Sequence, residues 1–225
     1  MIVKNLDEVI KTYSDLKKNF KVRSSVNFSE LITSSGSKII CNQNNKFQKG
    51  LYLFAMVKRD ILLYIKEYGV ITPFDELPVN CINEKFSKKK KIVGMDINNA
   101  YWSIANLKGY IRENTYNKGL SNPDFKPVRL SALSSLGKPK VYKVYEDGEY
   151  TKNELLKGNK ELENFYLDIR FSTYGVMREI ALKLGEDFQS WKTDCIFFYD
   201  TKENRKLVKT MFEDYGLECK IEKKG

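Results

Sequence analysis

Short apolar runs that lead directly into helical patterns are the feature that most constrains the fold of this chain. The run "KIVGMDI" (residues 91–97) is followed by "NNAYWSIANLKG", and the run "DCIFFYD" (residues 194–200) is followed by "TKENRKLVKTMFEDYG". Apolar runs of this length are typical of buried strands, and apolar residues three and four apart are typical of amphipathic helices. The final "LECKIEKK" predicts a further strand. These patterns predict an α+β protein in which helices back a sheet.

The N-terminal part of the chain predicts a mainly helical extension. Apolar residues at helical spacing predict a helix over residues 6–20. The Ser- and Asn-rich residues 24–48 predict loops with one or two strands. Residues 50–69 predict a largely buried helix with a solvated turn around Asp60.

An exposed connection over residues 72–91 marks the best domain boundary. We therefore expect the helical extension to occupy residues 1–87 and a second domain to occupy residues 88–225. Gly and Pro residues interrupt the segment over about residues 110–160, which we interpret as a middle insertion in the second domain.

The second half of that insertion carries a turn signal. The alternating stretch "KVYKVYEDGEY" predicts a strand that turns at Asp147 and Gly148. A long helical pattern then runs from Asn153 to Leu184, with an expected interruption near residues 172–175.

The absence of histidine is the sharpest compositional constraint on function. With no His among 225 residues, His-based nucleases, His-ligated metals and Ser–His triads are excluded. The four cysteines have no paired short spacing, so they predict neither a zinc cluster nor a disulfide framework, and a reducing, cytoplasmic setting fits them best. The formal net charge of +10 favours a polyanionic partner such as nucleic acid. No apolar run approaches membrane-spanning length, so we expect no membrane partner.

Two carboxylates stand at the ends of the apolar runs. Asp96 lies at the end of the first run, and Asp194 opens the second. If the two strands are neighbours in an antiparallel sheet, both acids are close enough to hold divalent ions that clamp the oxygens of a phosphoryl transfer. Hard oxygen ligands favour Mg²⁺ or Mn²⁺ over zinc. The alternative is that each Asp caps the turn or helix that follows it.

Three short motifs, in the same order along the chain, resemble the palm motifs of family B DNA polymerases. The stretch "DINNAYWS" (residues 96–103) resembles the first motif, D-x-x-S-L-Y-P-S. The stretch "FSTYG" (residues 171–175) resembles the end of the second, K-x-x-x-N-S-x-Y-G, and "KTDCIFF" (residues 192–198) resembles the third, D-T-D-S-I. The matching residues are Asp96 and Tyr101, then Ser172, Tyr174 and Gly175, then Thr193, Asp194 and Ile196. The resemblance covers residues 92–224 and implies an antiparallel palm-like sheet, with the middle insertion in place of the fingers.

The resemblance implies a metal site and a nucleotide site. In the family the matched acids hold the catalytic metals and the residue after the first offers a backbone carbonyl, which implies a Mg²⁺ or Mn²⁺ site of Asp96, Ile97 and Asp194. The residue matched by Tyr101 lies under the incoming sugar and disfavours a 2′-hydroxyl; an ordinary core aromatic is the alternative. Tyr174 and Gly175 would border the nascent base pair.

The chain departs from the family pattern at three positions. Lys192 stands where the third motif has its first Asp, so the implied metal site loses a negative charge and gains a cation. Leu167 stands where the second motif has Lys, and Phe171 stands where it has Asn. The nucleotide site therefore lacks its usual triphosphate-binding cation.

Other basic residues are candidates to replace that cation. Arg170 and Arg178 lie one helical turn before and after Tyr174, so all three can share one helix face. Lys138 and Lys140, in the middle insertion, are further candidates. For each of them a solvated surface position is the alternative.

A run of four lysines precedes the first motif. Lys88, Lys89, Lys90 and Lys91, together with Lys192, are candidate nucleic-acid-binding residues, because clustered ammonium groups neutralise phosphates. A soluble linker is the alternative for the run.

The size of the chain leaves no room for both a proofreading domain and long fingers. We therefore expect a stripped-down palm, such as a viral or mobile-element replication protein in the host cytoplasm. The leading hypothesis is template-directed nucleotidyl transfer by a two-metal mechanism. Its partners would be DNA, single-stranded or as primer–template, deoxynucleotides, Mg²⁺ or Mn²⁺, and other replication proteins. The alternatives are a catalytically inactive palm that binds DNA as a replication initiator or accessory protein, and an unrelated basic α+β nucleic-acid binder.

Overall fold

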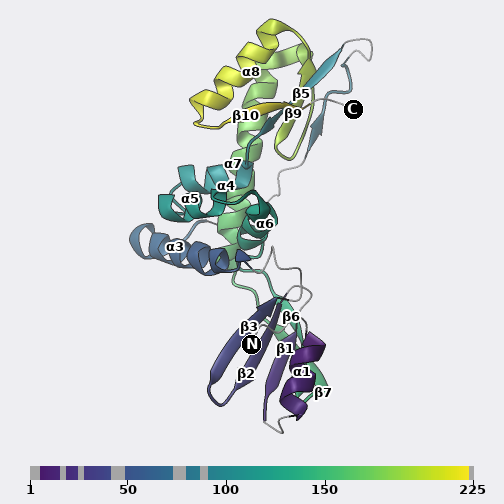
Figure 1. The fold of residues 1–225 in the computed structure, drawn as a ribbon. Coiled ribbons are helices and arrows are strands. Elements are labelled where there is room, and N and C mark those ends of the chain that lie inside the picture. Colours follow the sequence, from purple (N-terminus) through teal and green to yellow (C-terminus); the bar gives the residue numbers. More distant parts are fainter. Residues whose placement is uncertain are drawn as a thin grey trace. The chain divides into compact units, whose positions relative to one another are not determined.

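The structure, a computed structural model, describes residues 6–15, 19–24, 28–41, 49–72, 80–86 and 91–222 (Figure 1). By its internal contacts the chain divides into two units. Unit 1 comprises Met1–Ala55 and Gly119–Glu163, and unit 2 comprises Met56–Lys118 and Asn164–Gly225. The described residues form helices and two antiparallel five-stranded sheets, so the predicted α+β class is confirmed. Each unit combines segments from both sides of the boundary expected at residue 87.

The sheet of unit 1 has the strand order β3-β2-β1-β6-β7 (Figure 1). Its strands are β1 (Lys21–Ser24), β2 (Phe28–Thr33), β3 (Gly36–Cys41), β6 (Lys140–Glu146) and β7 (Glu149–Leu156). Residues 24–48 thus supply two strands, as the sequence predicts. The predicted turn is also confirmed, since Asp147 and Gly148 have φ of 51° and 94° between β6 and β7. Because β6 pairs with β1, the second half of the expected insertion over residues 110–160 belongs to this sheet.

The core of this sheet lies on one face. Val22 and Leu31 are directly opposite each other in β1 and β2, and both are buried with Phe20. Ile10 of α1 (Leu6–Asp15) packs against this cluster. The first predicted helix therefore covers the apolar face of a sheet that the sequence only partly predicts.

Further helices are α3 (Tyr52–Tyr68), α4 (Ala100–Leu107), α5 (Glu113–Leu120), α6 (Lys126–Ser134), α7 (Lys160–Leu184) and α8 (Lys202–Asp214), with short 3₁₀ turns η1 (Pro123–Phe125) and η2 (Gly185–Asp187). Two details of the predicted long helix are wrong. The helix begins at Lys160 rather than Asn153, because the preceding residues pair with β6 as strand β7. It also runs unbroken through Gly175, since one glycine costs a long helix only about 1 kcal/mol.

The sheet of unit 2 has the strand order β10-β5-β9-β8-β4. Its strands are β4 (Cys81–Ile82), β5 (Ile92–Ile97), β8 (Phe188–Lys192), β9 (Cys195–Tyr199) and β10 (Cys219–Glu222). Along β5, Val93, Met95 and Ile97 are buried, whereas Ile92 and Asp96 are partly exposed. Side chains alternate between the faces of a strand. Asp96 therefore lies on the more open face of this sheet.

The solvated turn predicted around Asp60 is wrong. Asp60 lies inside α3 and its side chain is 0% exposed. Its carboxylate accepts hydrogen bonds from the backbone N–H of Arg112, at 3.0 Å, and from the hydroxyl of Thr115. The guanidinium of Arg59 donates to the same carboxylate at 2.8 Å. The first N–H groups of a helix have no partner inside the helix, so a carboxylate on α3 satisfies the start of α5.

Candidate active site

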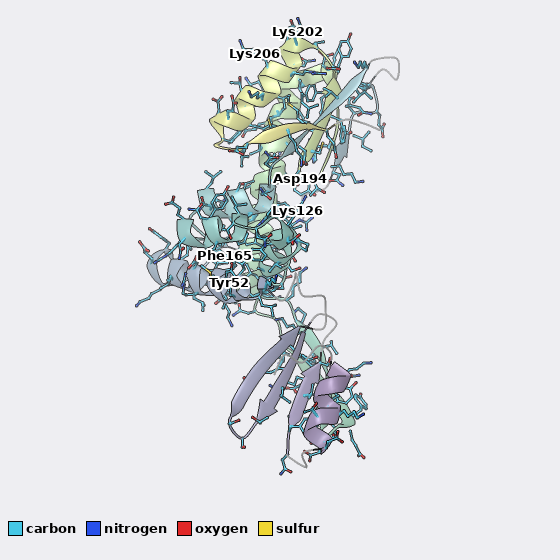
Figure 2. All side chains as sticks on the ribbon, in the orientation of Figure 1. Tyr52, Lys126, Phe165, Asp194, Lys202 and Lys206 are labelled. Atoms are coloured by element: carbon cyan, nitrogen blue, oxygen red, sulfur yellow. The ribbon has the colours of Figure 1, made fainter. Side chains whose placement is uncertain are left out.

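Asp96 lies on β5, and Asp194 lies in the turn that leads into β9, the neighbour of β5 in the sheet. In the antiparallel pairing of β5 with β9, Asp96 lies opposite Cys195, the residue that follows Asp194. The backbone N–H of Ile97 donates to the carbonyl oxygen of Asp194 at 2.9 Å. The two sequence motifs, almost a hundred positions apart, therefore meet on adjoining strands (Asp194 is labelled in Figure 2).

Asp194 lies in a tight turn between β8 and β9. The preceding Thr193 has φ of 57°, and its backbone N–H donates to Oδ1 of Asn80 at 2.9 Å. The hydroxyl of Tyr174 donates to the same Oδ1 at 3.4 Å. Asn80, which sequence reasoning missed, thus connects the second and third motifs.

A row of charged and polar side chains crosses the open face of the sheet. Lys192 lies opposite Cys195, Cys195 lies opposite Asp96, and Asp96 lies opposite Lys220. Residues directly opposite in an antiparallel pair point to the same face. The Nζ atom of Lys220 is 3.2 Å from Oδ2 of Asp96. Asp96 is therefore ion-paired with a lysine that the sequence motifs did not indicate.

The pKa of the Cys195 thiol depends on the charged groups around it. It is buried, and it donates a hydrogen bond to the carboxylate of Glu222 at 3.1 Å. Burial raises the pKa of this thiol far above its usual range, and the hydrogen bond to Glu222 and the charges of Glu222, Asp96 and Asp194 raise it further. Both candidate acids therefore act electrostatically on the same buried group.

Tyr101 lies in α4, within electrostatic reach of Asp194. Its ring meets the ring of Tyr166 edge-on, with centroids 5.9 Å apart. The pKa of Tyr101 is raised to about 12, first by burial and then by Tyr166, Tyr174 and Asp194, whereas Arg170 acts to lower it. The first motif, the long helix α7 and the turn of the third motif thus contribute to one cluster.

Arg170 is the cation of this cluster. Tyr166, Arg170 and Tyr174 are four residues apart along α7 and so share one face. The guanidinium carbon of Arg170 lies 5.9 Å from the centroid of the Tyr174 ring. Burial lowers the pKa of Arg170, but its hydrogen bond to Tyr174 and the nearby phenols raise it overall. Within the part of the chain that the structure describes, Arg170 has no carboxylate partner.

The other predicted nucleotide-site residues lie on open surface. Gly175 is exposed, and a Cβ added there would meet nothing within 4 Å. Arg178 is exposed on α7. Lys138 and Lys140 are exposed and belong to unit 1, and their nucleotide-binding role stays a prediction.

The predicted nucleic-acid residues are only partly described. Lys88, Lys89 and Lys90 lie outside the described residues. Lys91 is 82% exposed and its Nζ is 3.5 Å from Asp200. Lys192 is exposed on the row that contains Asp96. Two lysines therefore remain available to phosphates on unit 2.

The donor set around Asp96 suits an ion that arrives with phosphate ligands. Among the described residues, no three His, Cys, Asp or Glu side chains gather to hold a metal ion. Mg²⁺ is nevertheless commonly bound through one or two carboxylates plus substrate phosphates, rather than by an all-protein cage. Asp96 is not used as a cap either, because α4 follows Asn99 and Asp96 lies within β5. The fit with Mg²⁺ thus depends on Asp96, Asp194 and a bound nucleotide.

Comparison with protein-family models, with curated proteins and with solved structures finds no match to this chain. In the described ranges, no helix combines the length and the apolar character needed to span a membrane.

Proposed function

We propose that the chain is a minimal DNA-polymerase-like replication protein that performs template-directed nucleotidyl transfer with divalent ions. One observation carries the proposal: Asp96 lies opposite the residue that follows Asp194, on the open face of an antiparallel sheet. An acid within one strand and an acid in the turn that leads into its neighbour support a two-metal phosphoryl transfer, which needs two carboxylates within reach of the same ions. The bound ions would lower the barrier by neutralising charge on the transferred phosphate.

The protein groups have positioning roles in this proposal. Asp96 and Asp194 hold the ions, with the carbonyl of Ile97 as a further oxygen donor. The half-buried ring of Tyr101 excludes a ribose 2′-hydroxyl by steric clash. Arg170, which lies over the ring of Tyr174, binds the triphosphate; the Lys that has this role in the family motif is Leu167 in this chain.

DNA would bind mainly through its phosphates. The net charge of +10 supports this, as does the exposure of Lys91 and Lys192 on unit 2. The affinity for DNA should therefore fall steeply as salt concentration rises.

One observation favours a second candidate, a catalytically inactive palm that binds DNA as an initiator or accessory protein. Lys220 already pairs with Asp96, and Lys192 replaces an acid of the third motif. A lysine paired with Asp96 and a second lysine in place of a motif acid are consistent with a site that functions without metal.

Primer extension with Mg²⁺ separates the two candidates. We expect incorporation by the wild type and by Asp214→Asn, a matched change at an exposed acid of α8. We expect none by Asp96→Asn or Asp194→Asn, while anisotropy shows unchanged DNA binding for all variants. Full incorporation by either site variant eliminates the polymerase proposal, and DNA binding without incorporation under all metal and primer conditions supports the inactive palm.

The sugar selectivity of the reaction tests Tyr101 separately. Tyr101→Ala should incorporate ribonucleotides about tenfold or more readily than the wild type, because the lost clash is worth at least about 1.4 kcal/mol. Tyr150→Ala, at an exposed tyrosine of β7 in unit 1, serves as the control. An unchanged preference in Tyr101→Ala removes Tyr101 from this role.

A further inference from the structure

Lys220 forms an ion pair with Asp96 at the proposed metal site. It belongs to β10 and lies opposite Asp96, and its ammonium is 3.2 Å from the Asp96 carboxylate. The side chain of Asp96 is 20% exposed and that of Lys220 is 58% exposed. The ion pair therefore has one partly buried partner and one that is mostly in solvent.

The contacts of Lys220 contrast with those of another lysine in unit 2. Lys108 is 2.6 Å from Asp168, donates to Ser172 at 2.9 Å and lies over the ring of Tyr110. Asp168 also accepts a hydrogen bond from Tyr110 at 2.6 Å, so this pair is fixed from several sides. Lys220 has a single described partner, Asp96.

A lysine held by one exposed ion pair is easily displaced. Such pairs contribute little to stability, and the long side chain of Lys gains conformational freedom when it leaves. A divalent ion carries twice the charge and competes for the same carboxylate oxygen. The contact of Lys220 with Asp96 is thus weak enough for a divalent ion to displace the ammonium from the carboxylate.

We propose that the ammonium of Lys220 competes with the divalent ion for the carboxylate of Asp96. This competition sets the affinity of the site for metal. This inference rests on the proposed function, since it requires Asp96 to be a metal ligand. Lys220 acts through Asp96 and is a positioning residue. Without metal its ammonium neutralises Asp96, and when a metal–nucleotide complex binds, the ammonium moves into solvent.

Mn²⁺ binding in the presence of a non-hydrolysable deoxynucleoside triphosphate, followed by electron paramagnetic resonance, tests the proposal without any reaction. Lys220→Met should bind Mn²⁺ about tenfold more tightly than the wild type, because it removes a positive charge next to the ion. Lys220→Arg, which keeps the charge, should bind like the wild type. Lys209→Met, which breaks an exposed pair with Glu213 and changes the net charge equally, should also leave the affinity unchanged.

The outcomes distinguish the inference from the proposed function. If Asp96→Asn abolishes Mn²⁺ binding but Lys220→Met binds like the wild type, the role of Lys220 is wrong and the metal site stands. If Asp96→Asn binds Mn²⁺ as the wild type does, or if no variant binds it, the metal site and the role of Lys220 both fail. Near-ultraviolet circular dichroism checks that each variant is folded. If Lys220→Met does not fold, Lys220→Arg is the remaining variant at this position.

Discussion

The buried carboxylate of Asp60 allows a quantitative test of the structure. Asp60→Ala removes the acceptor for the N–H of Arg112, the hydroxyl of Thr115 and the guanidinium of Arg59. The side chain of Arg59 is 54% exposed and can hydrogen-bond to water instead, so the loss of its ion pair lowers the free energy of unfolding by about 0–1 kcal/mol. Thr115 is fully buried, and each donor left without an acceptor costs about 1–3 kcal/mol. With two such donors, we expect the free energy of unfolding to fall by about 2–7 kcal/mol.

Urea unfolding followed by tryptophan fluorescence measures this loss in the right part of the chain. The two tryptophans, Trp102 and Trp191, both belong to unit 2, and the indole N–H of Trp102 donates to the carbonyl of Tyr116 in α5 at 3.2 Å. Asp60→Asn keeps one acceptor oxygen and should lose only about 1–3 kcal/mol, whereas the exposed Asp214→Asn should change stability by less than about 0.5 kcal/mol. An Asp60→Ala protein within about 1 kcal/mol of the wild type would refute the capping role.

Three further predictions concern packing and ionisation near the candidate site. Gly94→Ala brings a Cβ to 2.8 Å from the ring of Phe197, so its unfolding free energy should fall by about 1–3 kcal/mol and recover in part with Phe197→Leu; wild-type stability would contradict this packing. Gly175→Ala should stabilise α7 by about 0.5–1 kcal/mol in thermal unfolding, since its Cβ meets open space, and a loss of stability would show that the position is crowded. Burial raises the pKa of Tyr101 from 10.0 to about 12, so the folded state binds this proton more tightly and the phenol's contribution to stability falls as pH rises between these values. Ultraviolet difference absorbance between wild type and Tyr101→Phe should show ionisation near the upper value, and a midpoint near the lower one would contradict the burial.

The sequence predicts elements whose signals are local. The apolar run with Asp96 forms β5, and the apolar run after Asp194 forms β9, because their short length and their content of branched and aromatic residues favour strands. The turn at Asp147 and Gly148 follows from residues that tolerate positive φ. The adjacency of β5 and β9 is a condition of the metal-site hypothesis, and the pairing of the two strands meets it.

The partners of those residues depend on register and tertiary packing, which a single sequence does not encode locally. Lys220 meets Asp96 only because β10 pairs with β5 in one register, and a shift of one residue would turn it to the other face. Asp60 is polar and directly follows two basic residues, so the local sequence favours exposure, and its burial depends on the packing of α5 against α3. Tyr166 had a local signal, its spacing of four and eight residues from Arg170 and Tyr174, which could have placed it in the candidate site.

A crystal structure of the chain with Mn²⁺ and a non-hydrolysable deoxynucleoside triphosphate tests the central claim most directly. The account predicts anomalous manganese density about 2.1 Å from carboxylate oxygens of both Asp96 and Asp194, with the triphosphate completing the coordination and Lys220 moved away from Asp96. Manganese bound elsewhere, or the two carboxylates on opposite faces of the sheet with no ion between them, would contradict it.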